Sequence, residues 1–133
     1  MVEFEKVLER KEKREQHKLA VLEDSEQIAE ILKDFLEENG FQVFHSQSGT
    51  DNWLENLEKE GVKHFLLDVE QERKPLGFQF AEKVKEKIKD SKIIMMSGNP
   101  DHKKEALDKK YDFISKPFRL VELLDTVKKH FEK

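Results

Sequence analysis

Apolar residues along this chain gather in short stretches that are separated by longer segments with helical spacing. A stretch of four or five mostly apolar residues between polar neighbours is typical of a strand that is buried on both faces. Such stretches predict five strands, at residues 19–22, 41–45, 64–67, 93–96 and 112–115. In the segments between and after them, apolar residues recur three or four positions apart, which predicts five amphipathic helices.

Cap and turn residues mark where several of these helices begin or end. The first is expected to end at Asn39–Gly40 and the second at Gly61. The other three are expected after Gly77, over residues 101–110 and over residues 120–131. Strands and helices that alternate in this way form a parallel sheet with helices on both faces, so the sequence predicts a doubly wound, five-stranded α/β domain.

Residues 1–17 precede this alternating pattern and carry dense mixed charge. Glu9 and Lys13 are spaced as a favourable helical ion pair, so an exposed N-terminal helix is expected ahead of a domain at residues 18–133. Two interpretations are open: a helix that forms a homodimer or couples signals, and a solvated extension without a partner. The apolar spacing does not continue beyond Leu8, which favours the extension.

Composition narrows the range of functions. The chain of 133 residues has the length of one domain, and 41% of its residues are charged, with a net charge of -4. This balance gives no attraction to nucleic acid or to an anionic membrane. The absence of cysteine excludes disulfides and thiolate chemistry. The longest apolar run, Ile93–Met96, cannot span a bilayer, and no signal peptide is visible, so a soluble cytoplasmic protein is expected.

Polar residues with complementary chemistry follow four of the five predicted strands. In strand order they are Glu23 with Asp24, then Asp68, Ser97 and Lys116. The carboxyl ends of parallel strands lie at one edge of a sheet, where open α/β sheets bind their ligands. We therefore expect three carboxylates, a hydroxyl and an ammonium group to lie close together.

Three neighbouring carboxylates require a cation, because two of them about 4 Å apart repel by roughly 4 kcal/mol at an effective dielectric of about 20. Oxygen ligands suit a hard ion, so Mg²⁺ is expected. A carboxylate beside Mg²⁺, a lysine and a hydroxyl can move a phosphoryl group, since that chemistry depends on positioning and charge neutralisation. Taken singly, Asp24 could be a helix N-cap, Ser97 a turn former and Lys116 a surface residue, but their convergence favours a site.

Four segments match one known family in order and spacing: Leu19–Asp24, Phe65–Asp68, Ile94–Gly98 and Phe113–Phe118. Through them, residues 18–133 resemble a response regulator receiver domain of the CheY-like superfamily. The resemblance implies a flavodoxin-like sheet with the strand order 2-1-3-4-5. It also implies a phosphoprotein of a two-component phosphorelay, which is no enzyme beyond its own Mg²⁺-dependent phosphorylation and dephosphorylation.

The same resemblance implies roles for the residues at the strand ends. Asp68 resembles the phosphoacceptor, which takes a phosphoryl group from a histidine kinase or a phosphotransfer protein. The Mg²⁺ ligands are expected to be the carboxylates of Glu23, Asp24 and Asp68 together with the backbone carbonyl of Glu70.

The phosphorylated state is expected to be read through three further residues. Ser97 and Lys116 resemble the residues that contact the phosphoryl group, with a cis bond from Lys116 to Pro117. Phe113 resembles an aromatic switch residue whose ring turns inward when Ser97 moves. The output is expected to be a contact with a downstream protein, for which an ordinary solvated basic helix is the alternative interpretation. The basic residues concerned are Lys103, Lys104, Lys109, Lys110 and Arg119.

Three features depart from the usual pattern of the family. The loop at residues 69–77 has no proline close to Asp68 and is one residue longer before its glycine, so a different loop shape is expected. The segment at residues 97–116 is short and lacks the common Gly-Ala pair, which predicts a shortened helix and an altered output surface. Glu23 stands where Asp is more usual, and it still suits a metal.

Two other functions fit parts of the pattern. A receiver-like interaction module that takes no phosphate would share the fold; the complete set of acceptor residues argues against it, while the long loop after Asp68 leaves it open. A haloacid-dehalogenase-like phosphatase would also use a strand-end Asp, a Ser and a Lys around Mg²⁺. Such enzymes need a second Asp two residues after the nucleophile, where this chain has Glu70, and the Glu23–Asp24 pair has the wrong order for them.

Overall fold

One parallel sheet of five strands forms the centre of the protein, for which a computed structural model describes residues 17–132. Each strand pairs with its neighbours in parallel, in the order β2-β1-β3-β4-β5, as predicted. This order places β2 and β5 at the edges and β1, β3 and β4 in the interior. The strands are β1 (Lys18–Leu22), β2 (Gln42–Ser46), β3 (His64–Asp68), β4 (Lys92–Ser97) and β5 (Asp112–Ser115).

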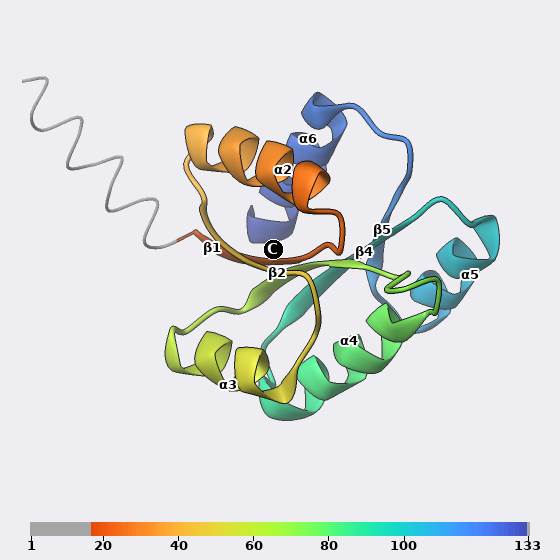
Figure 1. The fold of residues 1–133 in the computed structure, drawn as a ribbon, viewed down its shortest axis with the longest axis horizontal. Helices are drawn as coiled ribbons and strands as arrows, with labels where there is room; N and C mark the ends of the chain where they lie inside the picture. Colours follow the sequence, from red (N-terminus) through yellow and green to blue (C-terminus); the bar gives the residue numbers. More distant parts are fainter. Residues whose placement is uncertain (1–16, 133) are drawn as a thin grey trace, which may run out of the picture.

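Helices cover both faces of the sheet (Figure 1). Helices α2 and α6 lie on one face, and α3, α4 and α5 lie on the other. The doubly wound fold class is therefore confirmed. The helices are α2 (Glu26–Glu38), α3 (Asp51–Lys59), α4 (Leu76–Lys87), α5 (Pro100–Asp108) and α6 (Leu120–Glu132).

The alternation of side chains along each strand explains why the strands are apolar throughout. Ala20 and Leu22 belong to the apolar cluster under α3, α4 and α5, whereas Leu19 and Val21 belong to the cluster under α2 and α6. All four side chains are at most 1% exposed. Because both faces of β1 are covered, none of the four positions from Leu19 to Leu22 is suited to a polar residue.

Local caps set where the helices begin. The side-chain oxygens of Ser25, Thr50 and Asn99 each accept a hydrogen bond from a backbone N–H in the first turn of α2, α3 and α5. Ser25, and not Asp24, is therefore the N-cap of α2. Gly40, two residues after the end of α2, has a φ of 96°. This left-handed conformation favours glycine and stops the helix from continuing.

The element boundaries differ from the predicted ones by a few residues. Strand β2 starts at Gln42, one residue later than expected, and β3 and β4 extend to include Asp68 and Ser97. Backbone hydrogen bonding to the neighbouring strand continues past the last apolar residue in both cases, so the polar ends belong to the sheet. The predicted N-terminal helix lies at residues 1–17, of which only His17 is among the described residues.

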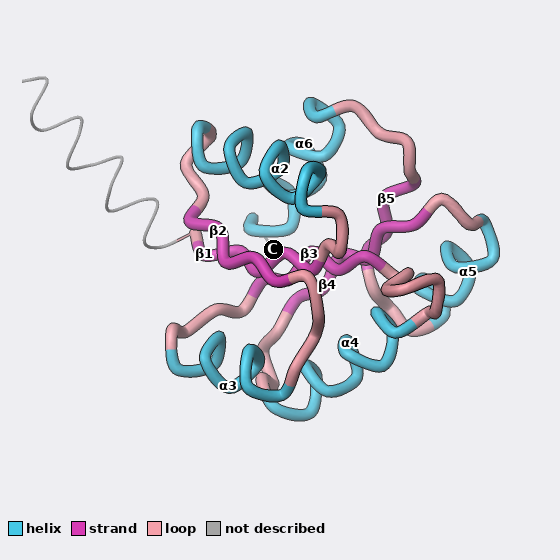
Figure 2. The backbone as a smooth tube through the Cα atoms, viewed as in Figure 1, coloured by secondary structure: helices cyan, strands magenta, loops and turns pink. Residues whose placement is uncertain are grey.

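The loops after β3 and β4 lie together at one side of the molecule, beside α5, on the right in Figure 2. They leave the carboxyl ends of β3 and β4, where Asp68 and Ser97 stand. In the described part of the chain, no helix combines the length and the apolar character that crossing a membrane requires.

Candidate functional site

Asp68 is the last residue of β3, and its side chain is buried at the carboxyl end of the sheet. The Lys116 ammonium group donates a hydrogen bond to Asp68 Oδ2 at 3.0 Å. The backbone N–H of Glu70 donates to the other carboxylate oxygen, Oδ1, at 3.1 Å. The carboxylate is thus held by a charged donor on one oxygen and a backbone donor on the other, which fixes its orientation.

Lys116 lies just beyond β5 and joins two acidic residues from different strands. Its Nζ atom is 3.1 Å from Glu23 Oε2 and 3.0 Å from Asp68 Oδ2. The side chains of Glu23 and Asp68 are only 2% and 8% exposed, so both depend on this ammonium group for charge compensation. The peptide bond between Lys116 and Pro117 is cis.

The electrostatics of this cluster reflect its burial. Burial raises the pKa of Asp68 to about 6, and the charge and hydrogen bond of Lys116 oppose the rise without cancelling it. Burial alone would lower the pKa of Lys116, but the charges and hydrogen bonds of Asp68 and Glu23 outweigh it and raise the pKa. Lys116 therefore stays charged, while the ionised form of Asp68 is held less favourably than in water.

Asp24 completes a group of three carboxylates. One carboxylate oxygen from each of Glu23, Asp24 and Asp68 lies within 4.8 Å of the other two. Asp24 is exposed, whereas the other two residues are buried, so the group opens to solvent on one side. Oxygen atoms at this spacing, with one open side, fit a hard divalent cation that retains water, and Mg²⁺ is the ion of this kind that the sequence predicted.

The loop after Asp68 forms a small hairpin. The backbone groups of Gln71 and Lys74 exchange two hydrogen bonds, at 2.8 and 2.9 Å. The two residues between them, Glu72 and Arg73, have φ values of 52° and 66°, as in a type I′ turn. This hairpin accommodates the length of the loop, and its Glu72 N–H donates to Asp24 Oδ2 at 3.3 Å.

The side chain of Gln71 lies under this hairpin and is 5% exposed. Its amide nitrogen donates to the backbone carbonyl of Glu70 at 3.1 Å. A carbonyl oxygen has two lone pairs, so the predicted metal ligand keeps one acceptor position. The contribution of the Glu70 carbonyl to a metal site stays a prediction.

Gly77 brings the start of α4 against the end of β3. A Cβ atom at this position would collide with the backbone carbonyl of Asp68. The Gly77 N–H also donates to the Val69 carbonyl at 2.8 Å. The close approach requires glycine here and fixes the backbone that carries Asp68.

Ser97, the last residue of β4, is 2% exposed. Its hydroxyl is hydrogen-bonded to a residue of α5 and not to Asp68. Its Oγ atom is 2.8 Å from Nδ1 of His102 and accepts a hydrogen bond from the Asn99 N–H at 3.0 Å. Nδ1 of His102 is also 3.9 Å from Glu70 Oε1. The sequence pattern did not single out His102, because its position in a basic helix carries no signal of contact with Ser97.

Two further residues complete the surroundings of the site. His45 on β2 donates from Nε2 to the backbone carbonyl of Glu23 at 2.9 Å, so the edge strand supports the acidic loop although the sequence assigned it no polar role. Phe113 on β5 is partly buried and packs against the apolar cluster under α3, α4 and α5. The predicted inward turn of its ring stays a prediction.

The predicted basic surface is partly neutralised. Lys109 forms ion pairs with Glu105 at 3.0 Å and with Glu82 at 3.5 Å, and its Nζ atom lies 4.8 Å from the centre of the Phe78 ring. The hydrogen bond with Glu105 is the largest cause of a raised pKa for Lys109. Lys109 is therefore engaged within the protein and offers a partner less charge than the sequence suggested.

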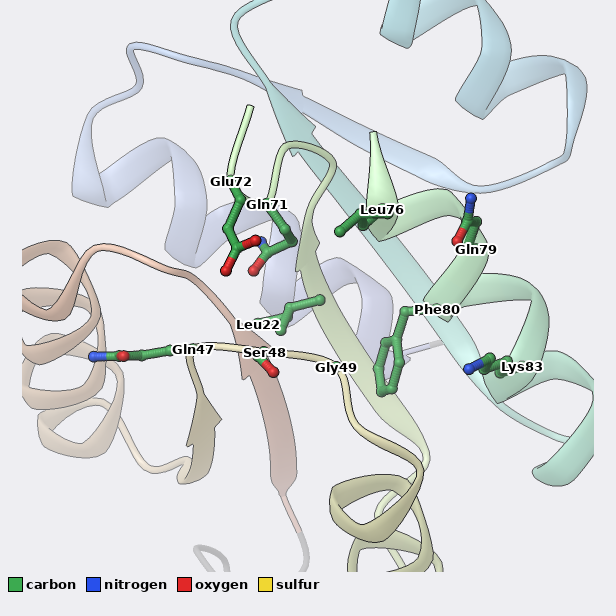
Figure 3. A pocket seen from close by; sticks show the side chains of 10 residues that line it. All are labelled: Leu22, Gln47, Ser48, Gly49, Gln71, Glu72, Leu76, Gln79, Phe80 and Lys83. Atoms are coloured by element: carbon green, nitrogen blue, oxygen red, sulfur yellow. The ribbon is translucent and has the colours of Figure 1, made fainter. Parts of the chain in front are cut away.

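A pocket of about 250 Å³ lies on the other side of the hairpin (Figure 3). Gln71 and Glu72 form one wall, Phe80 on α4 forms another, and Ser48 and Gly49 close it from the loop before α3. The side chains of Asp24, Asp68 and Lys116 do not line this pocket. It is thus separate from the carboxylate cluster, although the hairpin that forms its wall is hydrogen-bonded to Asp24.

Comparisons with known proteins agree with this fold. A family profile described as response regulator receiver domain matches residues 19–128. A search of curated protein sequences found no match. Among solved structures, a response regulator from Thermotoga maritima is 25% identical, with a TM-score of 0.73, covering 88% of this chain and 98% of that chain.

Two other solved structures have similar folds. A CheY-like response regulator receiver domain protein from Methanospirillum hungatei is 23% identical, with a TM-score of 0.76 over 87% of this chain and 94% of the other. The chemotaxis protein CheY4 from Vibrio cholerae is also 23% identical, with a TM-score of 0.72 over 85% of this chain and 97% of the other. At these identities the structures show the fold alone.

Proposed function

Because the chain belongs to the response regulator receiver domain family, we propose that it is a phosphorylation-dependent switch of a two-component system. Asp68 accepts a phosphoryl group from a phosphohistidine on a histidine kinase or a phosphotransfer protein. The phosphorylated domain then signals through contact with a downstream protein. The haloacid-dehalogenase-like phosphatase is set aside, because the matching family is a different one.

The observation that carries this proposal is the state of the Asp68 carboxylate. It is buried, oriented by Lys116 and the Glu70 N–H, and close to two other carboxylates. The Asp68 side chain is still 8% exposed, and the ammonium group of Lys116 lies beside the oxygens that would gain charge. Positioning and charge neutralisation are what phosphoryl transfer requires.

In the transfer step, a carboxylate oxygen of Asp68 attacks the phosphorus atom of the phosphohistidine. A P–O bond forms to Asp68 while the P–N bond to the imidazole breaks, and the bonding pair leaves with the nitrogen. The products are an aspartyl phosphate and a neutral imidazole, whose vacated nitrogen takes up a proton if the other ring nitrogen does not already carry one. Lys116 stays next to the phosphoryl oxygens and offsets their charge.

Glu23, Asp24 and Asp68, with the carbonyl of Glu70, would hold the Mg²⁺ ion. The ion would supply positive charge for the oxygens of the transferred group. The three acidic residues reach the site from two adjacent strands, β1 and β3, so the sheet itself fixes their spacing.

After transfer, the phosphoryl group brings about -1.5 to -2 charge and three strong acceptors into this cluster. Lys116 can donate to one of these oxygens, and the hydroxyl of Ser97 can donate to another if it turns away from α5. Ser97 pairs with Ser115 on β5, and Phe113 lies two residues before Ser115. A movement of Ser97 would therefore be passed to the ring of Phe113 and to the surface near α5.

Incubation with acetyl phosphate and Mg²⁺, followed by intact-mass measurement, tests the proposal. The wild type is expected to gain one phosphoryl group, and Asp68→Asn is expected to gain none, because an amide cannot form the acyl phosphate. Removal of Mg²⁺ with a chelator is also expected to prevent the gain.

A matched control is Asp90→Asn, which changes an aspartate whose side chain is 86% exposed and outside the site. This variant should be phosphorylated like the wild type. A wild type that stays unmodified with acetyl phosphate and with a panel of histidine kinases would contradict the proposal and favour an interaction module that works without phosphate.

A further inference from the structure

We propose that His102 is a positioning residue, which holds the hydroxyl of Ser97 in the unphosphorylated arrangement and so sets how readily the site accepts a phosphoryl group. The inference rests on the function proposed above and adds a residue to it. Ser97 Oγ and His102 Nδ1 are 2.8 Å apart, a good distance for a hydrogen bond that involves a hydroxyl.

The direction of this hydrogen bond follows from the burial of Ser97 and from its other contact. The backbone N–H of Asn99 donates to Ser97 Oγ at 3.0 Å, so the oxygen already acts as an acceptor. Among the described residues no other acceptor is hydrogen-bonded to this buried hydroxyl, so its proton points to Nδ1 of His102, which accepts it with the ring in the tautomer that carries its proton on Nε2. Both bonds point the hydroxyl toward the first turn of α5.

The imidazole is itself held in place. The His102 side chain is only 15% exposed, and its ring meets the ring of Phe78 edge-on, with centroids 6.0 Å apart. Its backbone N–H donates to the Asn99 carbonyl at 3.0 Å, which fixes the start of the helix. A ring packed in this way keeps its Nδ1 atom at the Ser97 hydroxyl instead of turning to solvent.

The hydroxyl of Ser97 has a single proton, so it cannot donate to His102 and to a phosphoryl oxygen at the same time. Among the hydrogen bonds of the described residues, none joins Ser97 to Asp68. A contact between Ser97 and a phosphoryl group on Asp68 therefore requires that the bond to His102 breaks. The histidine and the phosphoryl group compete for one proton.

This competition predicts the effect of removing the histidine. In His102→Leu, the buried Ser97 hydroxyl loses its acceptor in the unphosphorylated state but finds one in the phosphorylated state. The variant should therefore bind a phosphoryl mimic more tightly than the wild type, by about three- to ten-fold, the range of a single net hydrogen bond. His102→Asn offers a rescue, because Asn Oδ1 stands near the place of Nδ1 and can accept the same proton.

The test is a titration of the Mg²⁺-loaded protein with beryllofluoride, followed by NMR. The expected order of affinity is His102→Leu above the wild type, with His102→Asn within about two-fold of the wild type. Asp108→Asn, at an exposed position of the same helix, should match the wild type. Because beryllofluoride is not hydrolysed, a histidine that only activated the water for dephosphorylation would leave all these affinities equal.

Equal affinities for the wild type and His102→Leu, or equal gains in the Leu and Asn variants, would overturn the inference while leaving the proposed function intact. A wild type that binds no beryllofluoride would overturn the proposed function and this inference with it. A second measurement does not need a folded Leu variant. The nitrogen resonance of His102 Nδ1 in the wild type should move when beryllofluoride binds, and an unchanged resonance would also overturn the inference.

Discussion

The carboxyl and amino ends of the sheet both bury ionisable groups, but they compensate that burial differently. At the carboxyl end, Glu23 and Asp68 lie around the ammonium group of Lys116, with both distances near 3 Å. At the amino end, the ring of His64 stacks on Phe131, with centroids 3.6 Å apart and planes at 18°. Burial raises the pKa of Asp68 to about 6, and burial lowers the pKa of His64 to about 4. In both places burial disfavours the charged form.

The difference between the ends lies in what compensates the burial. The carboxyl end keeps its charges because a lysine is shared between two acids, and it remains open on the side of Asp24. The amino end avoids charge on His64, whose Nδ1 atom is buried without a hydrogen-bond partner among the described residues. The carboxyl end thus keeps charged groups buried around a shared lysine, whereas burial of His64 at the amino end disfavours charge on its ring.

Lys116→Met should have the largest effect on stability, because it removes the compensating charge at the carboxyl end. The variant leaves Glu23 and Asp68 buried without their cation, so the free energy of unfolding at pH 7 is expected to fall by about 3 kcal/mol. Urea denaturation measures it. Lys83→Met serves as the control, because Lys83 pairs with Asp51 at 3.1 Å in an exposed ion pair, which contributes less than about 1 kcal/mol. If both variants lose the same stability, Lys116 does not compensate the two acids.

At the amino end, His64→Phe should change how stability depends on pH. The unfolded chain takes up a proton on His64 below its ordinary pKa of 6.5, whereas the folded protein resists until about pH 4. Stability that depends on His64 is therefore present above pH 6.5 and is lost as the pH falls to about 4, by at most about 1.4 kcal/mol per pH unit. As the pH falls across this range, His64→Phe should become more stable relative to the wild type. Urea denaturation at a series of pH values measures the difference in stability, and a difference that does not change with pH would contradict the prediction.

Asp68→Asn should give the opposite sign at the carboxyl end, over a narrower range. The folded protein keeps a proton on Asp68 up to about pH 6, while the unfolded chain releases it at its ordinary pKa of 3.8. Stability that depends on Asp68 is thus present below pH 3.8 and is lost as the pH rises through about 6. Without metal, the variant should become progressively more stable than the wild type over that interval. Parallel stability curves for the two proteins would count against a raised pKa.

The fold could be predicted because each central strand is apolar on both faces. Residues of β1 alternate between two buried clusters, so the sequence shows an unbroken run that only a doubly covered strand requires. Strand β5 was placed at residues 112–115, as observed, because it ends at the polar Ser115 before Lys116. Glu23, Asp24 and Asp68 could be placed near each other because parallel pairing aligns the ends of β1 and β3.

The parts that could not be predicted depend on local backbone conformation and on contacts that follow no helical or strand period. The hairpin after Asp68 has Glu72 and Arg73 in left-handed conformations, although its turn lacks the Asn-Gly or Asp-Gly pair that marks such turns in a sequence. His102 was read only as part of a basic helix, because the spacing of five residues from Ser97 matches no helical or strand period. His45 was missed because its role is a contact with a backbone carbonyl.

The close approach at Gly77 also links the rigidity of α4 to that of the sheet. The Gly77 amide belongs to the first turn of a helix, where amides usually exchange their hydrogens quickly through fraying. Here it is bonded to the carbonyl of Val69, a residue with no exposed surface that directly follows Asp68. Deuterium uptake at this one amide therefore follows the opening of the sheet around Asp68, and the protein carries a natural probe of local unfolding at its own site.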